Sequence, residues 1–185
     1  MERKNKYIAS FISFMKLLIP YLAILFILRG FLLIPVPIDG NSMEKNLSQG
    51  DMVLMEKYTS IKRFDVIVFQ LPDGEIYVKR VIGLPGDSVR YENDQLYIND
   101  QKVDEPFLEE NKGKKKDTDV KPYTTNFELS SLLNQEQLGD DSYFVLGDNR
   151  RMSKDSRSFG AVDSKYILGK ARFVYYPLPH MKIIS

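Results

Sequence analysis

The stretch GDNRRMSKDSR occupies residues 147–157 and directly follows the apolar run Tyr143–Leu146. It gathers carboxylates, guanidiniums and hydroxyls within eleven residues. An arginine can bind a carboxylate through two parallel hydrogen bonds, so these side chains can form bidentate pairs that hold a loop rigid against neighbouring strands. The alternative interpretation is a charged, solvated turn.

Outward from this stretch, short apolar runs separated by turn residues fill most of the chain beyond Pro37. This pattern is typical of a largely β domain. Residues suited to turns, such as Pro72-Asp73-Gly74 and Leu84-Pro85-Gly86-Asp87, separate the runs. With 185 residues, we expect one globular unit with an appended segment. The predicted strands are Met52–Met55, Asp65–Phe69, Ile76–Ile82, Ser88–Tyr91, Gln95–Ile98, Tyr143–Leu146 and Lys170–Tyr176.

Lys79 lies in the predicted strand Ile76–Ile82, where alternation places it on one face with Tyr77 and Val81. Among apolar side chains the charged form of a lysine is disfavoured, so its amine can be neutral at about pH 7 and accept a proton from a hydroxyl. The alternative is an edge-strand lysine that points into water, because lysines are rarely buried.

Ser42 lies in Asp39-Gly40-Asn41-Ser42-Met43, a segment of mostly small and polar residues before the first predicted strand. Such residues keep a loop accessible, and Gly40 would let a substrate backbone approach closely. Backbone N–H groups nearby could bind an oxyanion. The segment therefore suits a nucleophilic serine, and a plain linker is the alternative.

The composition excludes several kinds of site. There is no cysteine, so thiol nucleophiles, thiolate metal sites and disulfides are excluded. The single histidine, His180, lies near the C-terminus, so we expect neither a His-containing catalytic triad nor a multi-His metal site. Basic and acidic residues number 26 and 25, a balance that argues against a nucleic-acid-binding protein.

The N-terminal part predicts a transmembrane anchor. The segment Leu17–Ile38 contains one charge, Arg29, and as a helix it would span about 33 Å, against the roughly 30 Å of a bilayer core. Basic residues dominate positions 1–16, which predicts a cytoplasmic N-terminus and an extracytoplasmic domain over residues 39–185. A cleaved signal or a buried core helix is the alternative, because the uninterrupted apolar run Leu17–Leu28 is short.

Residues 105–141 differ from the rest of the predicted domain. They are polar, contain Lys114-Lys115-Lys116, and show weak strand signals apart from Tyr123–Leu129. We therefore predict a polar, partly mobile insertion. We interpret the lysine run as a solvated loop, because neither interleaved aromatic residues nor a larger basic surface supports a binding patch.

Four blocks, taken in chain order after the apolar segment, resemble those of bacterial type I signal peptidases. They are Gly40-Asn41-Ser42-Met43, Gly50-Asp51-Met52-Val53, the stretch KRVIGLPGD at 79–87, and GDNRRMSKDSR at 147–157. The resemblance covers nearly the whole chain, and the short length with one anchor is similar to the form found in Gram-positive bacteria. It implies an antiparallel β domain behind a single membrane helix.

The resemblance implies a serine endopeptidase of the cell membrane that removes signal peptides from exported preproteins after small residues. Ser42 matches the nucleophile and Lys79 its general base, a Ser-Lys dyad that forms an acyl-enzyme without a metal or cofactor. Ser153 matches a hydroxyl that orients the lysine, and Gly40 with the Ser42 N–H would belong to the oxyanion loop. The preprotein would bind as an extended strand beside the lipid bilayer. The residues that match a supporting network are Asp148, Asn149, Arg150, Asp155, Ser156 and Arg157.

Lys45-Asn46 departs from the family, which usually has Pro-Thr after Ser42-Met43-Glu44. Without the fixed φ of proline, the loop behind the nucleophile would be looser. A membrane-tethered binding or accessory module with weak turnover is therefore an alternative function. The run Ser42–Lys45 also reads as the S-x-x-K motif of penicillin-binding proteins, but K-T-G is absent and the chain is too short for the helical domain of that class.

Overall fold

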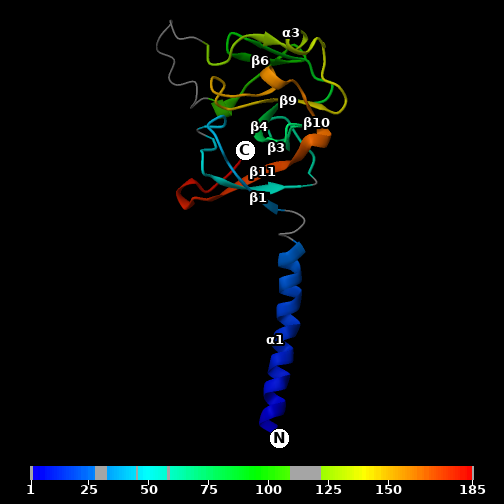
Figure 1. Ribbon diagram of the computed structural model, residues 1–185, viewed down its shortest axis with the longest axis vertical. Helices are drawn as coiled ribbons and strands as arrows, with labels where there is room; N and C mark the ends of the chain where they lie inside the picture. Colours follow the sequence, from blue (N-terminus) through cyan, green and yellow to red (C-terminus); the bar gives the residue numbers. More distant parts are fainter. Residues whose placement is uncertain (1, 28–32, 45, 58, 109–121, 185) are drawn as a thin grey trace.

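A computed structural model of the protein describes residues 2–27, 33–44, 46–57, 59–108 and 122–184. A long helix, α1 (Glu2–Ile27), projects from one end of a β domain that also holds the C-terminus (Figure 1). Arg29, Lys45 and the lysine run at 114–116 lie outside the described residues.

The domain contains two antiparallel sheets (Figure 1). In the larger sheet the strand order is β1-β2-β11-β3-β4-β9-β10, with β12 paired to β11, and in the smaller sheet it is β7-β6-β5-β8. The larger sheet comprises β1 (Leu33–Pro37), β2 (Met52–Glu56), β3 (Val66–Gln70), β4 (Ile76–Gly83), β9 (Ser142–Leu146), β10 (Val162–Asp163), β11 (Ile167–Tyr176) and β12 (Lys182–Ile183). The smaller sheet comprises β5 (Val89–Glu92), β6 (Gln95–Ile98), β7 (Gln101–Val103) and β8 (Phe127–Glu128).

Short helical elements connect the strands. They are η2 (Pro106–Leu108), α3 (Leu129–Leu133), α4 (Ser156–Phe159), η3 (Ser164–Tyr166) and η4 (Leu178–His180). The predicted mainly β, antiparallel fold is confirmed, and each predicted strand is present with small shifts of its ends. The short strands β7, β10 and β12 were not predicted, because two or three residues are too few to show a periodic pattern. β8 lies within Tyr123–Leu129, where the sequence shows a strand signal.

The predicted helix over Leu17–Ile38 was wrong at its C-terminal end. α1 ends at Ile27, and Leu33–Pro37 pair with β2 as the edge strand β1. Pro35 and Pro37 explain this difference, since proline lacks an N–H and drives the residue before it into extended conformations. An edge strand tolerates proline because one side of it needs no ladder hydrogen bonds.

The described side chains of α1 are mostly exposed, so the alternative of a buried core helix is wrong. Many of the exposed side chains are large and apolar: Phe11, Ile12, Phe14, Leu17, Ile19, Leu22, Ile24, Leu25 and Phe26. Among the described residues, no helix combines the length and the apolar character of a membrane span.

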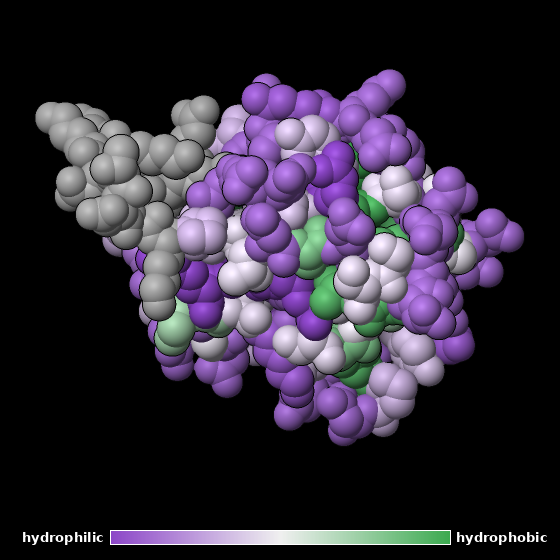
Figure 2. All heavy atoms as spheres, turned by 90° about the horizontal axis from the view of Figure 1, so that it is seen from above, coloured by the Kyte–Doolittle hydropathy of each residue, from purple (hydrophilic) through white to green (hydrophobic). Residues whose placement is uncertain are grey.

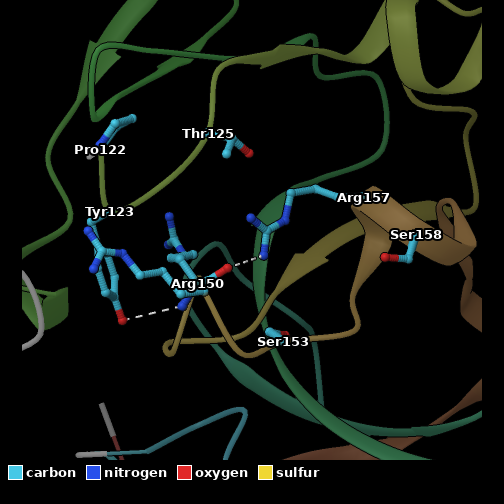
Figure 3. Close-up of a pocket in the computed structure, with 8 residues that line it drawn as sticks. Pro122, Tyr123, Thr125, Arg150, Ser153, Arg157 and Ser158 are labelled. Atoms are coloured by element: carbon cyan, nitrogen blue, oxygen red, sulfur yellow. Dashed lines mark hydrogen bonds between the residues drawn. The ribbon is translucent and has the colours of Figure 1, made fainter.

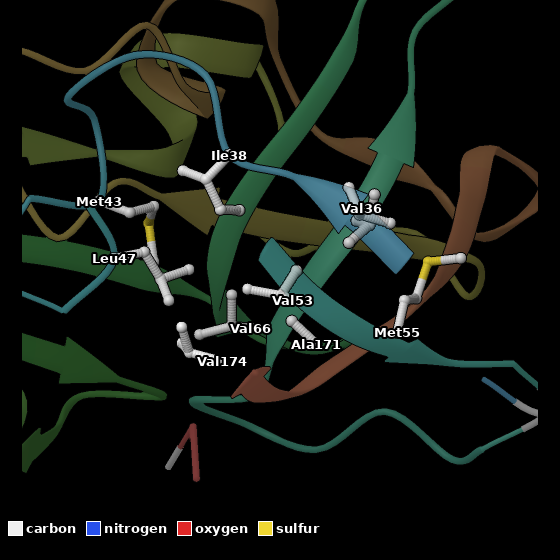
Figure 4. Packing of buried hydrophobic residues seen from close by; sticks show 10 residues of the cluster. Val36, Ile38, Met43, Leu47, Val53, Met55, Val66, Ala171 and Val174 are labelled. Atoms are coloured by element: carbon white, nitrogen blue, oxygen red, sulfur yellow. The ribbon is translucent and has the colours of Figure 1, made fainter. Parts of the chain in front are cut away.

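Three apolar clusters hold the domain together. The first lies beneath the loop between β1 and β2 (Figure 4) and consists of Val36, Ile38, Met43, Leu47, Val53, Met55, Val66, Val68, Ala171 and Val174. The second, under the smaller sheet, consists of Ile82, Val89, Tyr91, Leu96, Ile98, Leu129, Leu138, Phe144 and Leu146. The third consists of Ile67, Phe69, Val81, Val145 and Val162, on β3, β4, β9 and β10.

The described parts of residues 105–141 differ from the predicted polar insertion. Glu105, Leu108 and Thr124 are buried. Leu129 and Leu138 belong to the second cluster. These parts are therefore integral to the domain. Several of their polar side chains form hydrogen bonds inside the domain, as described below.

Candidate active site

Ser42 lies on the loop 38–51 between β1 and β2, which we call the nucleophile loop. Two backbone hydrogen bonds close its base, from Ile38 N to Asp51 O at 2.8 Å and from Gly50 N to Ile38 O at 3.0 Å. Met43 and Leu47 are 2% and 1% exposed and insert into the first apolar cluster (Figure 4). These two side chains anchor the loop in the core beside the half-buried Ser42.

Lys79 projects from β4 toward this serine. It is only 3% exposed, and its Nζ donates a hydrogen bond to Ser42 Oγ at 2.6 Å. The same Nζ lies 5.4 Å from the centroid of the Tyr77 ring, and Val81 belongs to the third cluster. The prediction that Lys79 lies on an apolar face is therefore confirmed, and its amine lies within hydrogen-bond distance of Ser42.

The surroundings of Lys79 make its neutral form accessible. Burial lowers the pKa of the Lys79 amine to about 8, while the carboxylates of Asp155 and Asp148 act in the opposite direction. Desolvation dominates because the amine has lost most of its contact with water. With a pKa of about 8, roughly one tenth of the amine is neutral at pH 7.

Arg80, next to Lys79 in β4, ties this strand to the stretch 147–157. Its Nε and Nη2 donate to Asp148 Oδ1 and Oδ2 at 2.9 and 2.8 Å, and both side chains are at most 1% exposed. Arg80 Nη1 also donates to the Phe64 carbonyl at 2.7 Å. A bidentate pair fixes both orientation and distance, but its arginine lies outside the stretch 147–157 in which such pairs were predicted.

The nucleophile loop is in direct contact with residues 147–149. Asn149 N donates to the Ser42 carbonyl at 3.0 Å, and Asn149 Nδ2 donates to the Asn41 carbonyl at 3.2 Å. A Cβ atom on Gly147 would lie 2.5 Å from the Ser42 carbonyl oxygen and 2.2 Å from Ser153 Oγ. Position 147 therefore needs glycine because the two segments approach too closely for a side chain.

A second buried ion pair holds the same stretch from the side of the smaller sheet. Arg150 pairs with Glu105, and both side chains are fully buried. Arg150 Nη1 donates to Tyr91 Oη and to Thr124 Oγ1, each at 3.2 Å, and its Nε donates to the Gly147 carbonyl at 3.0 Å. The guanidinium therefore connects the smaller sheet to the backbone that faces Ser42.

Asp155, Ser156 and Arg157 complete the predicted network. Asp155 accepts from Arg157 Nε at 2.8 Å and from Gly147 N at 3.1 Å. Arg157 Nη2 donates to the Arg150 carbonyl at 2.7 Å, and Ser156 Oγ accepts from Val145 N at 2.9 Å. The structure thus brings the six predicted network residues together around one turn.

A cavity of about 560 Å³ lies on the outer side of this turn (Figure 3). Tyr123 Oη bridges two of the turn's backbone groups there: it donates to the Asp148 carbonyl at 2.7 Å and accepts from Arg150 N at 3.3 Å. In Figure 3 the chain of hydrogen bonds runs from Tyr123 through Arg150 to Arg157. Tyr123 belongs to the segment that was predicted as an insertion, and its hydrogen bonds restrain the turn.

Ser153 does not make the predicted hydrogen bond to Lys79. Its Oγ is buried, yet it has no hydrogen-bond partner among the described residues. This hydroxyl lies against the Cα of Gly147, while the Lys79 amine is directed at Ser42. An unpaired buried hydroxyl is unfavourable, so Ser153 has unused capacity to bind a group that comes within reach.

Ser42 and Lys79 both line a groove of about 630 Å³. One wall is formed by residues 36–43 and the other by residues 75–79, with Met152 and Lys154 beside them. Gly40 has a φ of +85°, and nothing lies within 4 Å of the position of a Cβ there. Its backbone is consequently open to a ligand in the groove.

Several residues of the site were not predicted from the sequence: Glu105, Tyr91, Thr124, Tyr123 and Asn46. Their partners lie 14 to 102 residues away along the chain, so no local spacing marks them. Lys45 of the S-x-x-K run lies outside the described residues, within which Lys79 is the lysine that contacts Ser42.

Comparison with known proteins gives consistent results. Residues 11–176 match the family described as "Signal peptidase, peptidase S26". Signal peptidase IB of Staphylococcus aureus is 40% identical over 167 residues, which are 86% of each chain. Signal peptidase I of Bacillus caldolyticus is 43% identical over 154 residues, which are 81% of this chain and 83% of that one.

A solved structure is also similar. The crystal structure of a signal peptidase I from Enterococcus faecalis V583 matches with a TM-score of 0.56 and 39% sequence identity. The match covers 60% of this chain and 97% of the crystallised one.

Proposed function

This chain belongs to the peptidase S26 family of signal peptidases and is a serine endopeptidase, and on this basis we propose that it removes signal peptides from exported preproteins with Ser42 and Lys79 as its catalytic dyad. The observation that carries the proposal is the 2.6 Å contact between Lys79 Nζ and Ser42 Oγ, made by an amine that is almost completely buried.

In the proposed mechanism, neutral Lys79 accepts the proton of Ser42 as Ser42 Oγ attacks the scissile carbonyl carbon. The resulting tetrahedral intermediate collapses when the peptide C–N bond breaks, and the Lys79 ammonium returns the proton to the leaving amine. This gives an acyl-enzyme on Ser42. Water then attacks the ester, with Lys79 again as the base, and releases the second product.

The oxyanion is proposed to bind at the turn that holds Ser42. The Ser42 backbone N–H and the open backbone at Gly40 are the groups nearest to a carbonyl under attack by Ser42 Oγ. Donors that are already oriented stabilise the charge of the intermediate without reorganisation. Two observations support this assignment: Met43 anchors the turn in the core, and the space around Gly40 is open to a carbonyl group.

Ser153 is proposed to orient Lys79 in the later steps of the reaction. In the acyl-enzyme, Ser42 Oγ is part of the ester. The Lys79 amine then lacks the hydroxyl partner that it has in the resting enzyme. The buried Ser153 Oγ, which has no partner in the described part of the chain, is a hydroxyl that could then bind it. This order of events reconciles the role implied by the family resemblance with the resting geometry.

The preprotein is proposed to bind as an extended strand in the groove between residues 36–43 and 75–79. Main-chain groups on both walls can add hydrogen bonds to an extended peptide, as in other cases of β-augmentation. Small residues before the cleaved bond would fit the close approach of the substrate backbone to Gly40.

We further propose that α1 tethers the enzyme to the bilayer, with the N-terminus in the cytoplasm and the domain outside. The exposed apolar side chains on α1 support this, because such a surface is unfavourable in water. The opposite end of the molecule is largely hydrophilic, with a narrow hydrophobic strip at its centre (Figure 2). The tether would concentrate the dyad beside precursors that are held in the same membrane.

A cleavage assay tests the proposed function. The detergent-solubilised protein is incubated with a precursor that carries an Ala-x-Ala site, and mass spectrometry locates the cut. We expect cleavage after the second alanine, and loss of cleavage in Ser42→Ala and in Lys79→Met. Full activity of either variant would refute the dyad, whereas a wild-type protein that binds the precursor without cutting it would favour the accessory-module alternative.

A further inference from the structure

Asn46 connects the nucleophile loop to two distant parts of the chain. Its Nδ2 donates to Asp148 Oδ2 at 2.7 Å and to the Phe107 carbonyl at 3.3 Å. Both acceptors are oxygen atoms that cannot donate, so the amide nitrogen, rather than its oxygen, must face them. The orientation of the Asn46 side chain is thereby determined by its partners.

Both partners of Asn46 contact Arg80, the neighbour of Lys79 in β4. Asp148 forms the bidentate pair with Arg80, and the Phe107 ring centroid lies 4.1 Å from the Arg80 guanidinium carbon. A second aromatic ring, Phe64, packs against Phe107 at 5.1 Å. Asn46 therefore attaches the loop that carries Ser42 to the rigid group that holds the strand of Lys79.

Apolar packing alone leaves the position of Ser42 incompletely defined. Met43 and Leu47 hold the loop at its depth in the core, but hydrophobic contacts are not directional. Hydrogen bonds are directional. Asn149 donates to the loop residues Asn41, Ser42 and Glu44, and Asn46 adds the bond to Asp148 from the other side of position 45. Without the Asn46 bond, the loop would be joined to residues 148 and 149 on one side only and could pivot about Asn149.

We propose that Asn46 is a positioning residue that sets the distance between the Ser42 hydroxyl and the Lys79 amine by binding the loop to the Arg80–Asp148 pair. The inference rests on the proposed function, because its consequence is a faster attack by Ser42. It also assigns a structural purpose to one of the two positions where this chain departs from the usual Pro-Thr of the family. An amide donor replaces a threonine hydroxyl at that position.

The test compares Asn46→Ala with a matched control, Asn99→Ala, in the full-length protein and the precursor assay. The Asn99 side chain also makes hydrogen bonds, to Asp87 Oδ1 and from the N and Oγ of Ser88, but it lies in a turn of the smaller sheet. For Asn46→Ala we expect kcat to fall about tenfold, which corresponds to about 1.4 kcal/mol in the barrier, with KM changed less than about twofold. For Asn99→Ala we expect an unchanged kcat even if the unfolding temperature falls.

Two further variants provide readouts that a purely structural role would not move. N46T keeps a hydroxyl donor, so its kcat should lie between those of the wild type and Asn46→Ala. N46D places a second carboxylate against Asp148, near the positive charges of Arg80 and Lys79. A carboxylate at position 46 cannot donate to Asp148 and repels it, so the kcat of N46D should fall at least as far as that of Asn46→Ala. A kcat for N46T well above that of N46D, at similar KM, would separate the loss of the donor from a general loss of stability.

The proposal is overturned if Asn46→Ala keeps the wild-type kcat, or if its kcat falls by the same factor as that of Asn99→Ala. If Asn46→Ala fails to fold, N46T and N46D decide the question, and equal kcat values for these two variants overturn the proposal. Failure of the proposed function is recognised separately, because the wild type would then leave the precursor uncut or Ser42→Ala would retain cleavage.

Discussion

The Lys79 amine donates a hydrogen bond to the Ser42 hydroxyl at 2.6 Å, although the two residues are 37 positions apart in the chain. The contact joins a loop anchored by buried apolar side chains to a central strand of the larger sheet. A buried amine beside a hydroxyl has its charged form disfavoured, and it has an immediate source of a proton once it is neutral.

The pH dependence of cleavage should follow the ionisation of Lys79. Burial lowers the pKa of this amine to about 8, and only the neutral form can accept the serine proton. We expect kcat/KM to rise about tenfold per pH unit below pH 8 and to level off above it. Steady-state kinetics from pH 6 to pH 9.5 measure this. A profile that is flat between pH 6 and pH 8 would contradict the assignment of Lys79 as the base.

Lys79→Met should stabilise the fold while it abolishes cleavage. The folded-state pKa of Lys79 is depressed from 10.5 to about 8, so below pH 8 the folded protein holds a charged amine in an unfavourable environment. Removing the amine should raise the free energy of unfolding by about 1–3 kcal/mol in that range. The gain should shrink as the pH rises from about 8 toward 10.5, because the amine is then neutral in the folded state only. Denaturant titrations at pH 7 and pH 10 would show this trend, and a loss of stability at pH 7 would contradict it.

Gly147→Ala should inactivate the enzyme. The added Cβ would lie 2.2 Å from Ser153 Oγ and 2.5 Å from the Ser42 carbonyl oxygen, so the nucleophile loop must move away from β4. We expect kcat/KM to fall more than about hundredfold, since a displacement of about 1 Å at the reacting atoms has effects of this size. Gly139→Ala is the matched control, because a Cβ there makes only an ordinary contact, 3.5 Å from Ser142 Oγ. Similar kcat/KM values for the two variants would show that the close approach at Gly147 is unimportant.

Glu105→Ala should destabilise the domain by about 3–5 kcal/mol, because it leaves the Arg150 charge buried and unpaired. The control is Glu92→Gln, which breaks the exposed pair with Arg90 and should change stability by at most about 1 kcal/mol. Thermal or urea unfolding of both variants measures the difference. Equal effects would mean that the Arg150–Glu105 pair contributes no more than a surface pair.

The proposed tether predicts how the protein partitions in the cell. If α1 spans the bilayer, the full-length chain should stay with membranes after washing at high salt and alkaline pH, because apolar contacts are not screened by ions. Externally added protease should reach the domain but leave the N-terminus protected. Release of the protein by salt alone would indicate a charge-mediated, peripheral attachment instead.

The sequence alone determined the features that depend on local pattern. Alternation of apolar residues located strands such as β4 and β6 close to their observed ends, because side chains of a strand alternate between its faces. The blocks around Ser42, Lys79 and Asp148 identified the family, since several uncommon residue types occur there in one order. The number of apolar residues in Leu17–Ile38 misled the prediction toward a helix. Pro35 and Pro37 instead favour the extended backbone of the edge strand β1.

The tertiary structure decided which partner each polar group has. No spacing predicts that Arg150 pairs with Glu105, that Asn46 binds Asp148, or that the buried Ser153 hydroxyl has no partner among the described residues. Such contacts join residues that are distant in the chain, and their strength depends on the exclusion of water by several elements at once. The low pKa of Lys79 arises in the same way, because a lysine loses its hydration only when β4, the nucleophile loop and the turn at 147–157 enclose it together.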